Sequence, residues 1–507
     1  MTRNKDNSIN EQHWQDEDLY CHDLPTTPRP RTGKVLVTGA SGYIGGRLVS
    51  ELLARGYQVK AMIRAASPVY GSRWPTAEIV VADALQPESL RTALQDVYTA
   101  YYLIHSLLLG PKKFAETDLR AAVNFRKAAE QAGVNNIIYL GGLCDTQSLL
   151  SNHLRSRMKV AEELSCGEVP VTVLRAAVII GSGSASYEII QYVVRRLPVI
   201  LMPPWAQTKC QPVAIRDVTK YLVGALETPE TVGKQLDIGG VDILTYGQML
   251  KIMAELLGKK RIFLHIPFSC IRIFSYLGSL LTPVPTAITL CLMEGLLNDV
   301  VCQDSEAREL IPFQTLTYKQ AIVKALSRQE QDRVYTRWSD AYPPAHELAV
   351  KLHELDGPAK YTTSYSLSTK KSAASLFASV CKIGGKEGWF YHNWMWRMRG
   401  GIDRIFLGVG SSRGRKRRLD LEMNDVVDFW RVEDIQLNER LLLRSEMRMP
   451  GKGWMEFTTK QHDSGSVLSV TAHYDTNTFF GHLYWYLFLP LHYFVFTKLL
   501  MQIEKRS

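Results

Sequence analysis

Short apolar runs rich in β-branched residues alternate with helix-length segments between residue 33 and about residue 240. The first crossover segment has apolar residues at helical spacing, namely Leu48, Val49, Leu52 and Leu53. This alternation is typical of parallel strands joined by helical crossovers. The runs are KVLVTG, QVKAMIR, AEIVVAD, TAYYLIHS, NNIIYLGG and VTVLRAAVII. They predict an α/β fold with a doubly wound parallel sheet.

The pattern becomes helical and more apolar from about residue 241 to residue 330. Arg272, Pro283 and Pro285 interrupt the longest apolar stretch, so a membrane span is not expected there. We interpret this region as a small helical substrate lobe beside the strand ends.

A second change of pattern begins near residue 361. Leu441, Leu443 and Met447 alternate with charged residues, which predicts a half-buried, curved antiparallel sheet. The chain then runs into a long apolar segment at 479–503. An aromatic cluster lies between these features, and we favour a core role for it over a cavity for a lipid-like ligand. Its members are Trp389, Phe390, Tyr391, Trp394 and Trp396.

These changes divide the 507 residues into four parts. We expect a disordered polar tail at 1–32, a nucleotide-binding domain with its lobe at 33–330, a linker at 331–360 and a second domain at 361–507.

The amino-acid composition argues against several kinds of functional site. The eight cysteines form no CxxC pair or Cys/His cluster, so neither a disulfide framework nor a metal site is expected. This usage suits a reducing cytoplasm. The net charge of +10 includes the basic run at 411–420, which we interpret as a solvated loop rather than a phosphate, lipid or nucleic-acid site. We expect no nucleic-acid partner.

Three glycines carry the clearest functional motif. Gly39, Gly42 and Gly45 lie between the first strand and the first helix. This spacing permits a tight turn, lets the main chain approach a pyrophosphate and lets the helix pack closely on the sheet. The helix N-terminus then attracts the phosphates. The motif predicts a dinucleotide site, to which Ser41, Tyr43 and Ile44 also belong.

The end of the second strand bears on the choice of cofactor. An NAD site usually has an acidic residue there, whereas this strand ends in Ile63 and Arg64. Arg64 would meet a 2′-phosphate and Arg73 would assist, which favours NADP(H) over NAD(H). Asp83 ends the third strand and would either accept a hydrogen bond from the adenine or cap its own loop.

TGASGYIG matches the TGxxGxxG fingerprint of the short-chain dehydrogenase/reductase superfamily, and residues 33–330 resemble its atypical NmrA-like branch. Almost the whole chain also resembles two-domain proteins in which this unit is fused to an uncharacterised C-terminal domain. The resembling segments include HLRSR, IGGKEGWFY, RGGIDR, DFWRVE, MPGKGWMEF and GHLYWYLFLPLH. The resemblance implies an α+β helix-grip domain of the START/polyketide-cyclase type, with an apolar cavity.

The family's Tyr-x-x-x-Lys pair is replaced here. The resemblance places His153 at the tyrosine and Arg157 at the lysine, and the fifth strand lacks the usual serine. His153 would act as a general acid, and Arg157 would bind ribose or phosphate but not serve as a base. The alternative is that both residues are structural. His105 and Tyr43 would lie near the nicotinamide, and Tyr187 is a weaker candidate.

Three hypotheses follow. The first is a cytoplasmic NADP(H)-dependent oxidoreductase acting on an unidentified, apolar substrate. The second is a non-catalytic NAD(P)-binding regulator or assembly protein, because the catalytic pair is missing. The third is a membrane-associated lipid-binding protein, because residues 479–501 are long enough to span a bilayer. Against a span stand His482, Pro490 and His492, and we favour a cavity-closing helix. The sequence does not indicate an oligomeric state.

Overall fold

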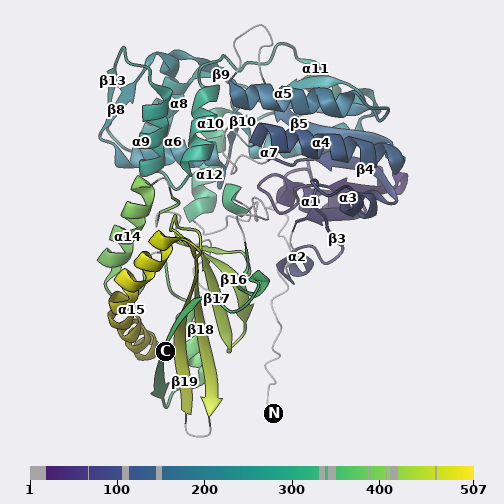
Figure 1. Cartoon of the computed structure of the whole chain (residues 1–507). Coiled ribbons are helices and arrows are strands. Elements are labelled where there is room, and N and C mark those ends of the chain that lie inside the picture. The colour runs from purple at the N-terminus through teal and green to yellow at the C-terminus, as the bar shows by residue number, and fades with distance from the viewer. Residues whose placement is uncertain are drawn as a thin grey trace, which may run out of the picture.

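A seven-stranded parallel sheet forms the centre of the N-terminal part of the molecule (Figure 1). Its strand order is β11-β6-β5-β4-β1-β2-β3, which confirms the doubly wound sheet. The strands are β1 Lys34–Val37, β2 Val59–Ile63, β3 Glu78–Val81, β4 Val97–Tyr102, β5 Asn136–Gly142, β6 Val171–Ala176 and β11 Gln235–Ile238. The computed structural model describes residues 19–64, 66, 68–105, 114–143, 151–330, 337–340, 350–385, 387–406, 408–410, 421–462 and 465–507.

Helices cover both faces of this sheet, so its central strands are buried on two sides, whereas the edge strand β3 is partly exposed. One face packs on α1 and α7 and the other on α3, α4 and α5. The helices are α1 Gly45–Ala54, α2 Pro68–Arg73, α3 Pro87–Leu94, α4 Phe114–Gln131, α5 Asn152–Ser165 and α7 Ile215–Glu227. Burial on both sides explains the continuous apolar runs in the sequence.

The small lobe is larger than the sequence pattern indicated. It begins with α6 and shares a separate apolar core with α8 and α12. Its helices are α6 Ala185–Arg196, α8 Tyr246–Leu256, α9 Ile271–Leu281, α10 Thr286–Gly295, α11 Glu306–Leu310 and α12 Tyr318–Glu330. Its short strands are β7 Ile179–Ile180, β8 Val199–Met202, β9 Lys209–Cys210, β10 Val213–Ala214, β12 Leu244–Thr245 and β13 Ile262–His265. The predicted run VTVLRAAVII is therefore split between β6 and β7.

Residues 19–32 do not behave as the disordered tail that we predicted. Tyr20 and Cys21 are buried, and their N–H groups donate to the carboxylate of Glu51, at 2.5 and 3.1 Å. The side chain of Thr26 hydrogen-bonds to Glu227. The polar composition of this segment is thus matched by buried carboxylates of the first domain. Residues 1–18 lie outside the described residues.

The C-terminal part is a six-stranded antiparallel sheet, as predicted, in the order β14-β19-β18-β17-β16-β15. The strands are β14 Tyr361–Thr369, β15 Val426–Val427, β16 Trp430–Gln436, β17 Arg440–Ser445, β18 Lys452–His462 and β19 Gly465–Asp475. The helices are α13 Ala373–Val380, α14 Asn393–Ile405 and α15 Phe479–Arg506. One side of α15 packs against β14, β19 and α13.

Two details of this domain differ from our predictions. The half-buried pattern is wrong for β17, where Leu442 and Arg444 are buried as well as Leu441 and Leu443. On the neighbouring strand β16, Glu433 accepts a hydrogen bond from the Leu352 N–H at 2.7 Å. The aromatic cluster is core at Trp389 and Phe390 but not at Trp394, whose side chain is 59% exposed.

A buried carboxylate holds the N-terminal segment to the first domain. Glu227 is fully buried and pairs with Arg55 at 2.7 Å, while the Tyr57 hydroxyl donates to it at 3.1 Å. We expect Glu227→Ala to lower the free energy of unfolding by about 3 kcal/mol, because Arg55 and Tyr57 lose their buried acceptor. Urea denaturation would measure this. The exposed neighbour Glu230→Ala is the control, with an expected change below about 0.5 kcal/mol. Equal effects of the two substitutions would contradict this role.

Candidate functional site

A cavity of about 430 Å³ opens at the carboxyl ends of the parallel strands. Residues distant in the sequence meet there: the loop after β1, the ends of β2, β4 and β5, the start of α5, and α10 of the small lobe. A crevice at this edge is where doubly wound sheets bind their ligands. The arrangement joins the predicted glycine motif to the predicted catalytic positions in one space.

The turn between β1 and α1 is too tight for side chains. Gly39 has φ +62°, and a Cβ there would lie 2.8 Å from the Leu103 carbonyl oxygen. A Cβ on Gly45 would lie 2.3 Å from the Gly39 carbonyl oxygen. The N–H of Gly42 donates to that same oxygen at 2.9 Å and closes the turn. The N-cap residue of α1, Ile44, makes no side-chain cap. The N–H groups of Gly46 and Arg47 donate to the Gly42 and Ile44 carbonyls, so the main chain at residues 41–45 is the part of this turn that borders the cavity.

Eight of the nine residues predicted to bind the cofactor line this cavity. They are Gly39, Ser41, Gly42, Tyr43, Ile44, Gly45, Arg64 and His105. Asp83 does not line it, because its carboxylate accepts from the Leu85 N–H at 2.9 Å and caps its own loop. Arg73 also lies outside the cavity and packs over the Trp74 ring.

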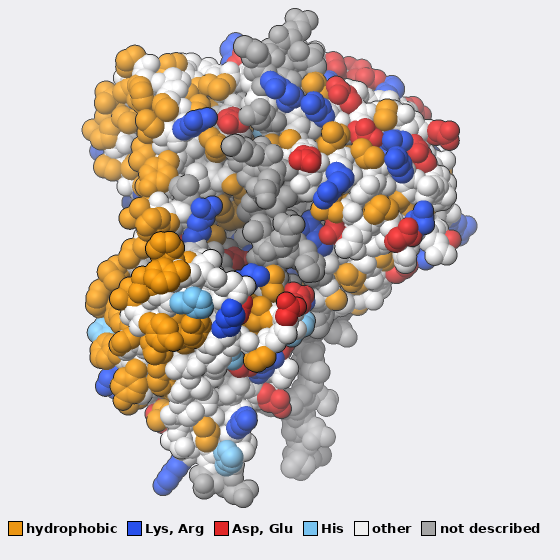
Figure 2. All heavy atoms as spheres, in the orientation of Figure 1, with side chains coloured by type: hydrophobic (Ala, Val, Ile, Leu, Met, Phe, Trp, Pro, Cys, Tyr) orange, Lys and Arg blue, Asp and Glu red, His pale blue; other side chains and the backbone are white. Residues whose placement is uncertain are grey.

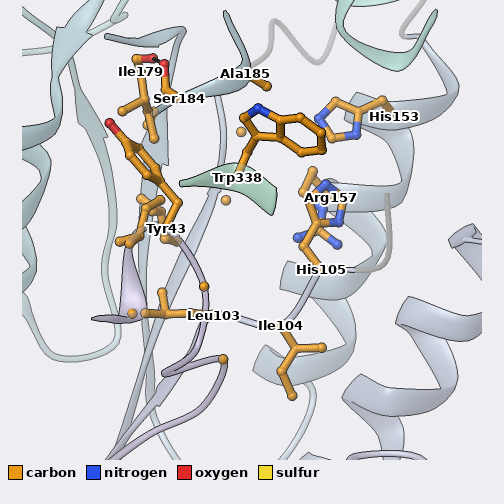
Figure 3. A pocket seen from close by; sticks show the side chains of 18 of the residues that line it. Tyr43, Leu103, Ile104, His105, His153, Arg157, Ile179, Ser184, Ala185 and Trp338 are labelled. Atoms are coloured by element: carbon orange, nitrogen blue, oxygen red, sulfur yellow. Dashed lines mark hydrogen bonds between the residues drawn. The ribbon is translucent and has the colours of Figure 1, made fainter. Parts of the chain in front are cut away.

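A buried acid organises the far end of the cavity. The Asp118 carboxylate, on α4, contacts Arg157 at 2.5 Å and the Nδ1 atom of His105 at 3.0 Å. The His105 ring stacks on His153, with ring centroids 5.2 Å apart (Figure 3). The structure therefore brings the two predicted catalytic residues together with His105, and adds an acid that the sequence did not single out.

The end of β5 explains how α5 comes so close. The usual serine of this strand is replaced by Gly141 and Gly142. A Cβ on Gly142 would lie 3.2 Å from Leu154 and 3.8 Å from Arg157. The missing side chain thus leaves room for Leu154, in the first turn of α5, to pack closely on the strand.

Burial and a neighbouring cation keep both histidines neutral. Burial and then the Arg157 charge lower the pKa of His105 to about 4, although Asp118 opposes this. Burial, followed by His105 and Arg157, holds the pKa of His153 well below its usual range. Three buried nitrogen atoms here have no hydrogen-bond partner among the described residues: His105 Nε2, His153 Nδ1 and Arg157 Nε. Such atoms are costly to bury unpaired, which is consistent with a polar ligand group in the cavity.

Trp338 is a cavity residue that the sequence reasoning missed. It comes from the region that we predicted as a linker, and its indole stands between Tyr43 and His153 in Figure 3. Its ring N–H donates to Glu188 at 2.7 Å, and its main-chain N–H donates to the Gly183 carbonyl at 2.9 Å. A tryptophan in a polar stretch was the only available signal. Tyr187, by contrast, is buried in the core of the lobe.

Two further predictions concern the basic run and a metal site. The basic run at 411–420 lies outside the described residues. Within the ranges that the structure describes, no group of three or more His, Cys, Asp or Glu side chains is arranged to hold a metal ion.

Two family models match the chain. The NmrA-like family matches residues 31–340, and a protein family of unknown function, DUF2867, matches residues 356–499. The second match covers the antiparallel domain and does not identify it as START-like.

Two curated relatives each match a little under half of this chain. A divinyl chlorophyllide a 8-vinyl-reductase of Zea mays is 27% identical over 250 residues, which cover 46% of this chain and 61% of that protein. A photosystem II assembly factor Ycf39 of Guillardia theta is 24% identical over 249 residues, covering 48% of this chain and 76% of that protein. The chain spans about three fifths of the length of the reductases that it matches.

A solved structure also matches part of the chain. The triphenylmethane reductase of Citrobacter sp., solved with NADP(H), is 20% identical and covers 57% of this chain and 99% of its own, with a TM-score of 0.48.

The lowered pKa of His105 predicts a pH effect on stability. The unfolded chain binds more protons than the folded chain between the ordinary histidine pKa of 6.5 and about 4. Stability should therefore fall as the pH falls through this window. We expect His105→Gln, which stays neutral, to remove about 2 kcal/mol of this pH dependence, after allowance for the partly exposed ring. Urea titrations at several pH values would test it, with the exposed His353→Gln as control. Parallel pH profiles for His105→Gln and the parent would contradict this assignment.

Proposed function

The chain belongs to the NmrA-like family of NAD(P)-binding Rossmann proteins, and we propose that it is an NADP(H)-dependent reductase of an apolar, unsaturated substrate. One observation carries the proposal: a single cavity runs from the glycine turn to the buried His105, His153 and Arg157. A cofactor in the turn and a substrate beside the histidines would then share one enclosed space.

The residues present fit a dinucleotide phosphate. The turn at Gly39 and Gly45 leaves no room for a Cβ, so the main chain can approach a pyrophosphate closely. The main chain at residues 41–45, at the positive end of α1, lines the cavity and would bind the phosphate oxygens. Arg64 lines the same cavity and would pair with a 2′-phosphate, which supports NADP(H) over NAD(H).

The rest of the cavity wall suits an apolar substrate. Ile288 and Leu292 from α10 and Val300 line it, and the Trp338 indole offers a flat aromatic surface. Such walls favour an apolar, planar molecule over a sugar. The Zea mays relative is named for the reduction of a vinyl group, which agrees with an unsaturated substrate.

The chemistry requires a hydride and a proton. The reduced nicotinamide would supply the hydride to one carbon of the substrate double bond. The proton for the neighbouring atom would come from solvent and pass through the neutral imidazole of His153, whose Nδ1 atom is buried and lacks a partner among the described residues. Arg157, fixed by Asp118, stays charged and would stabilise the negative charge that develops between the two transfers. Trp338 and the lobe would exclude water.

A second candidate is a non-catalytic cofactor-binding protein. The close pair between Arg157 and Asp118 favours it, because an arginine held in this way has a structural role without any catalysis. The Guillardia theta relative, named as an assembly factor, agrees with this alternative. A cytoplasmic location and the absence of a nucleic-acid partner stay predictions.

We further propose that the C-terminal domain has a START-like arrangement with a filled interior. Its antiparallel sheet and the long helix α15 support the resemblance. Trp389 stacks on Trp396 at 4.3 Å and on Phe429 at 6.5 Å within its core. These rings occupy the interior where a ligand would otherwise bind.

Cofactor choice is open to a direct test. We expect calorimetry to show tighter binding of NADPH than of NADH, and Arg64→Ser to weaken NADPH binding at least about tenfold while NADH binding stays unchanged. Arg91→Ser, on an exposed part of α3, should change neither affinity. An unchanged preference in Arg64→Ser would contradict the role of Arg64.

The catalytic proposal is tested with His153→Ala. NADPH oxidation would be followed with a panel of apolar conjugated alkenes and enones. We expect His153→Ala to lower kcat about a hundredfold without changing the affinity for NADPH, because only proton delivery is lost. If the parent protein binds NADPH but oxidises it with none of these compounds, the result would contradict the reductase proposal and support the non-catalytic alternative.

A further inference from the structure

Three helices present apolar side chains to the solvent along one side of the molecule. They are α9 of the small lobe and α14 and α15 of the C-terminal domain, which lie along the left of Figure 1. Figure 2 shows the hydrophobic side chains gathered along this same edge. We call the exposed outer sides of these three helices the apolar face.

The α14 helix is amphipathic, but its apolar stripe faces the solvent. Trp394, Met398, Ile402 and Ile405 recur at helical spacing and are all exposed, Ile405 to 61%. The charged residue Asp403 is instead buried. A surface helix of a soluble protein normally turns its apolar stripe to the core. The stripe of α14 is exposed to solvent instead. An exposed apolar stripe of this kind marks a surface that binds an apolar partner.

The α15 helix is apolar on both sides. Its inner side packs on the sheet through residues such as Trp485, Phe496 and Leu499. Its outer side exposes further large apolar residues: Phe479, Phe480, Leu483, Tyr486, Leu487, Tyr493, Phe494 and Met501. A helix that is hydrophobic all round is normally buried in a core or in a membrane.

The apolar face is continuous across the two domains. The guanidinium of Arg404, on α14, donates to the Ser279 and Leu280 carbonyls at the end of α9. The Tyr276 hydroxyl donates to the Ile405 carbonyl at 3.4 Å. These bonds fix α14 beside α9, where Ile273 is also exposed. Hydrogen bonds between the two domains therefore hold this part of the apolar face in a fixed arrangement.

The exposed charged residues of the three helices are cations. Exposed cations border it at Arg272, Arg397 and Lys498, and Lys505 follows at the end of α15. The carboxylates of the three helices, all of whose residues are described, are Asp403, which is buried, and Glu504, which accepts from the Thr369 hydroxyl. The face therefore offers apolar side chains and cations together, with aromatic residues such as Trp394 and Tyr486 among them.

We propose that this face docks onto the surface of an anionic lipid bilayer, with the helices lying in the plane of the membrane. Apolar and aromatic side chains would enter the acyl boundary, and the bordering cations would bind the headgroups. The exposed cations of these helices favour anionic lipid over a second copy of this chain, which would meet the same cations. The inference does not depend on the proposed reaction.

The helix α15 would lie on the bilayer and not cross it. It is the described helix that is long and apolar enough to span, with 28 residues and a mean hydropathy of 1.2 in its most apolar stretch. Crossing would remove Trp485, Phe496 and Leu499 from the core of the sheet. Docking in the plane keeps those contacts and buries the outer side as well.

Vesicle sedimentation tests the proposal with the full-length protein. The vesicles would be phosphatidylcholine alone, or phosphatidylcholine mixed with phosphatidylglycerol. We expect strong binding to the mixed vesicles, weakened by high salt. Ile402→Glu combined with Leu487→Glu should lower the partition coefficient on the order of a hundredfold, since two apolar side chains no longer enter the lipid. Arg397→Ser with Lys498→Ser should weaken binding to the mixed vesicles only.

The matched control is Leu437→Glu combined with Val81→Glu, which removes exposed apolar residues from the β16–β17 turn and from β3. It should bind vesicles as the parent does. All variants would be checked for an unchanged urea midpoint and unchanged NADPH affinity. The proposal is overturned if the parent binds neither vesicle, if the control weakens binding equally, or if light scattering shows a dimer that Ile402→Glu with Leu487→Glu dissociates.

Discussion

The turn from β1 into α1 can be made only by residues without side chains, and the rest of the site depends on this constraint. Gly39 and Gly45 lie so close to the Leu103 and Gly39 carbonyl groups that a Cβ would overlap them. Their closeness draws the N-terminus of α1 to the ends of β2 and β4. The uncapped helix end, Arg64 and the His105 strand end therefore border one cavity.

The C-terminal domain contributes to this cavity through the chain that connects it. Trp338 enters the cavity, and the next residue, Ser339, offers its carbonyl to Arg431 of the antiparallel sheet at 3.2 Å. Arg404 fixes the same domain to α9. Through these contacts the second domain holds Trp338, part of the wall of the first domain's cavity, in place.

Local patterns predicted the parallel sheet, the glycine turn and the antiparallel domain, because β-branched runs and glycine spacing are properties of neighbouring residues. They did not predict β11, since QLDI is short and contains an acid. Asp118 looked like an ordinary helix residue, and only the fold brings it to Arg157 and His105. Tyr20 and Trp338 were missed for the same reason, because their partners Glu51 and Glu188 are distant in the sequence.

A crystal structure of the protein grown with NADPH would test the central claim most directly. The account predicts the pyrophosphate against the first turn of α1, the 2′-phosphate beside Arg64 and the nicotinamide on the side of His153. Nucleotide density elsewhere on the molecule, or a nicotinamide directed away from His153, would contradict it.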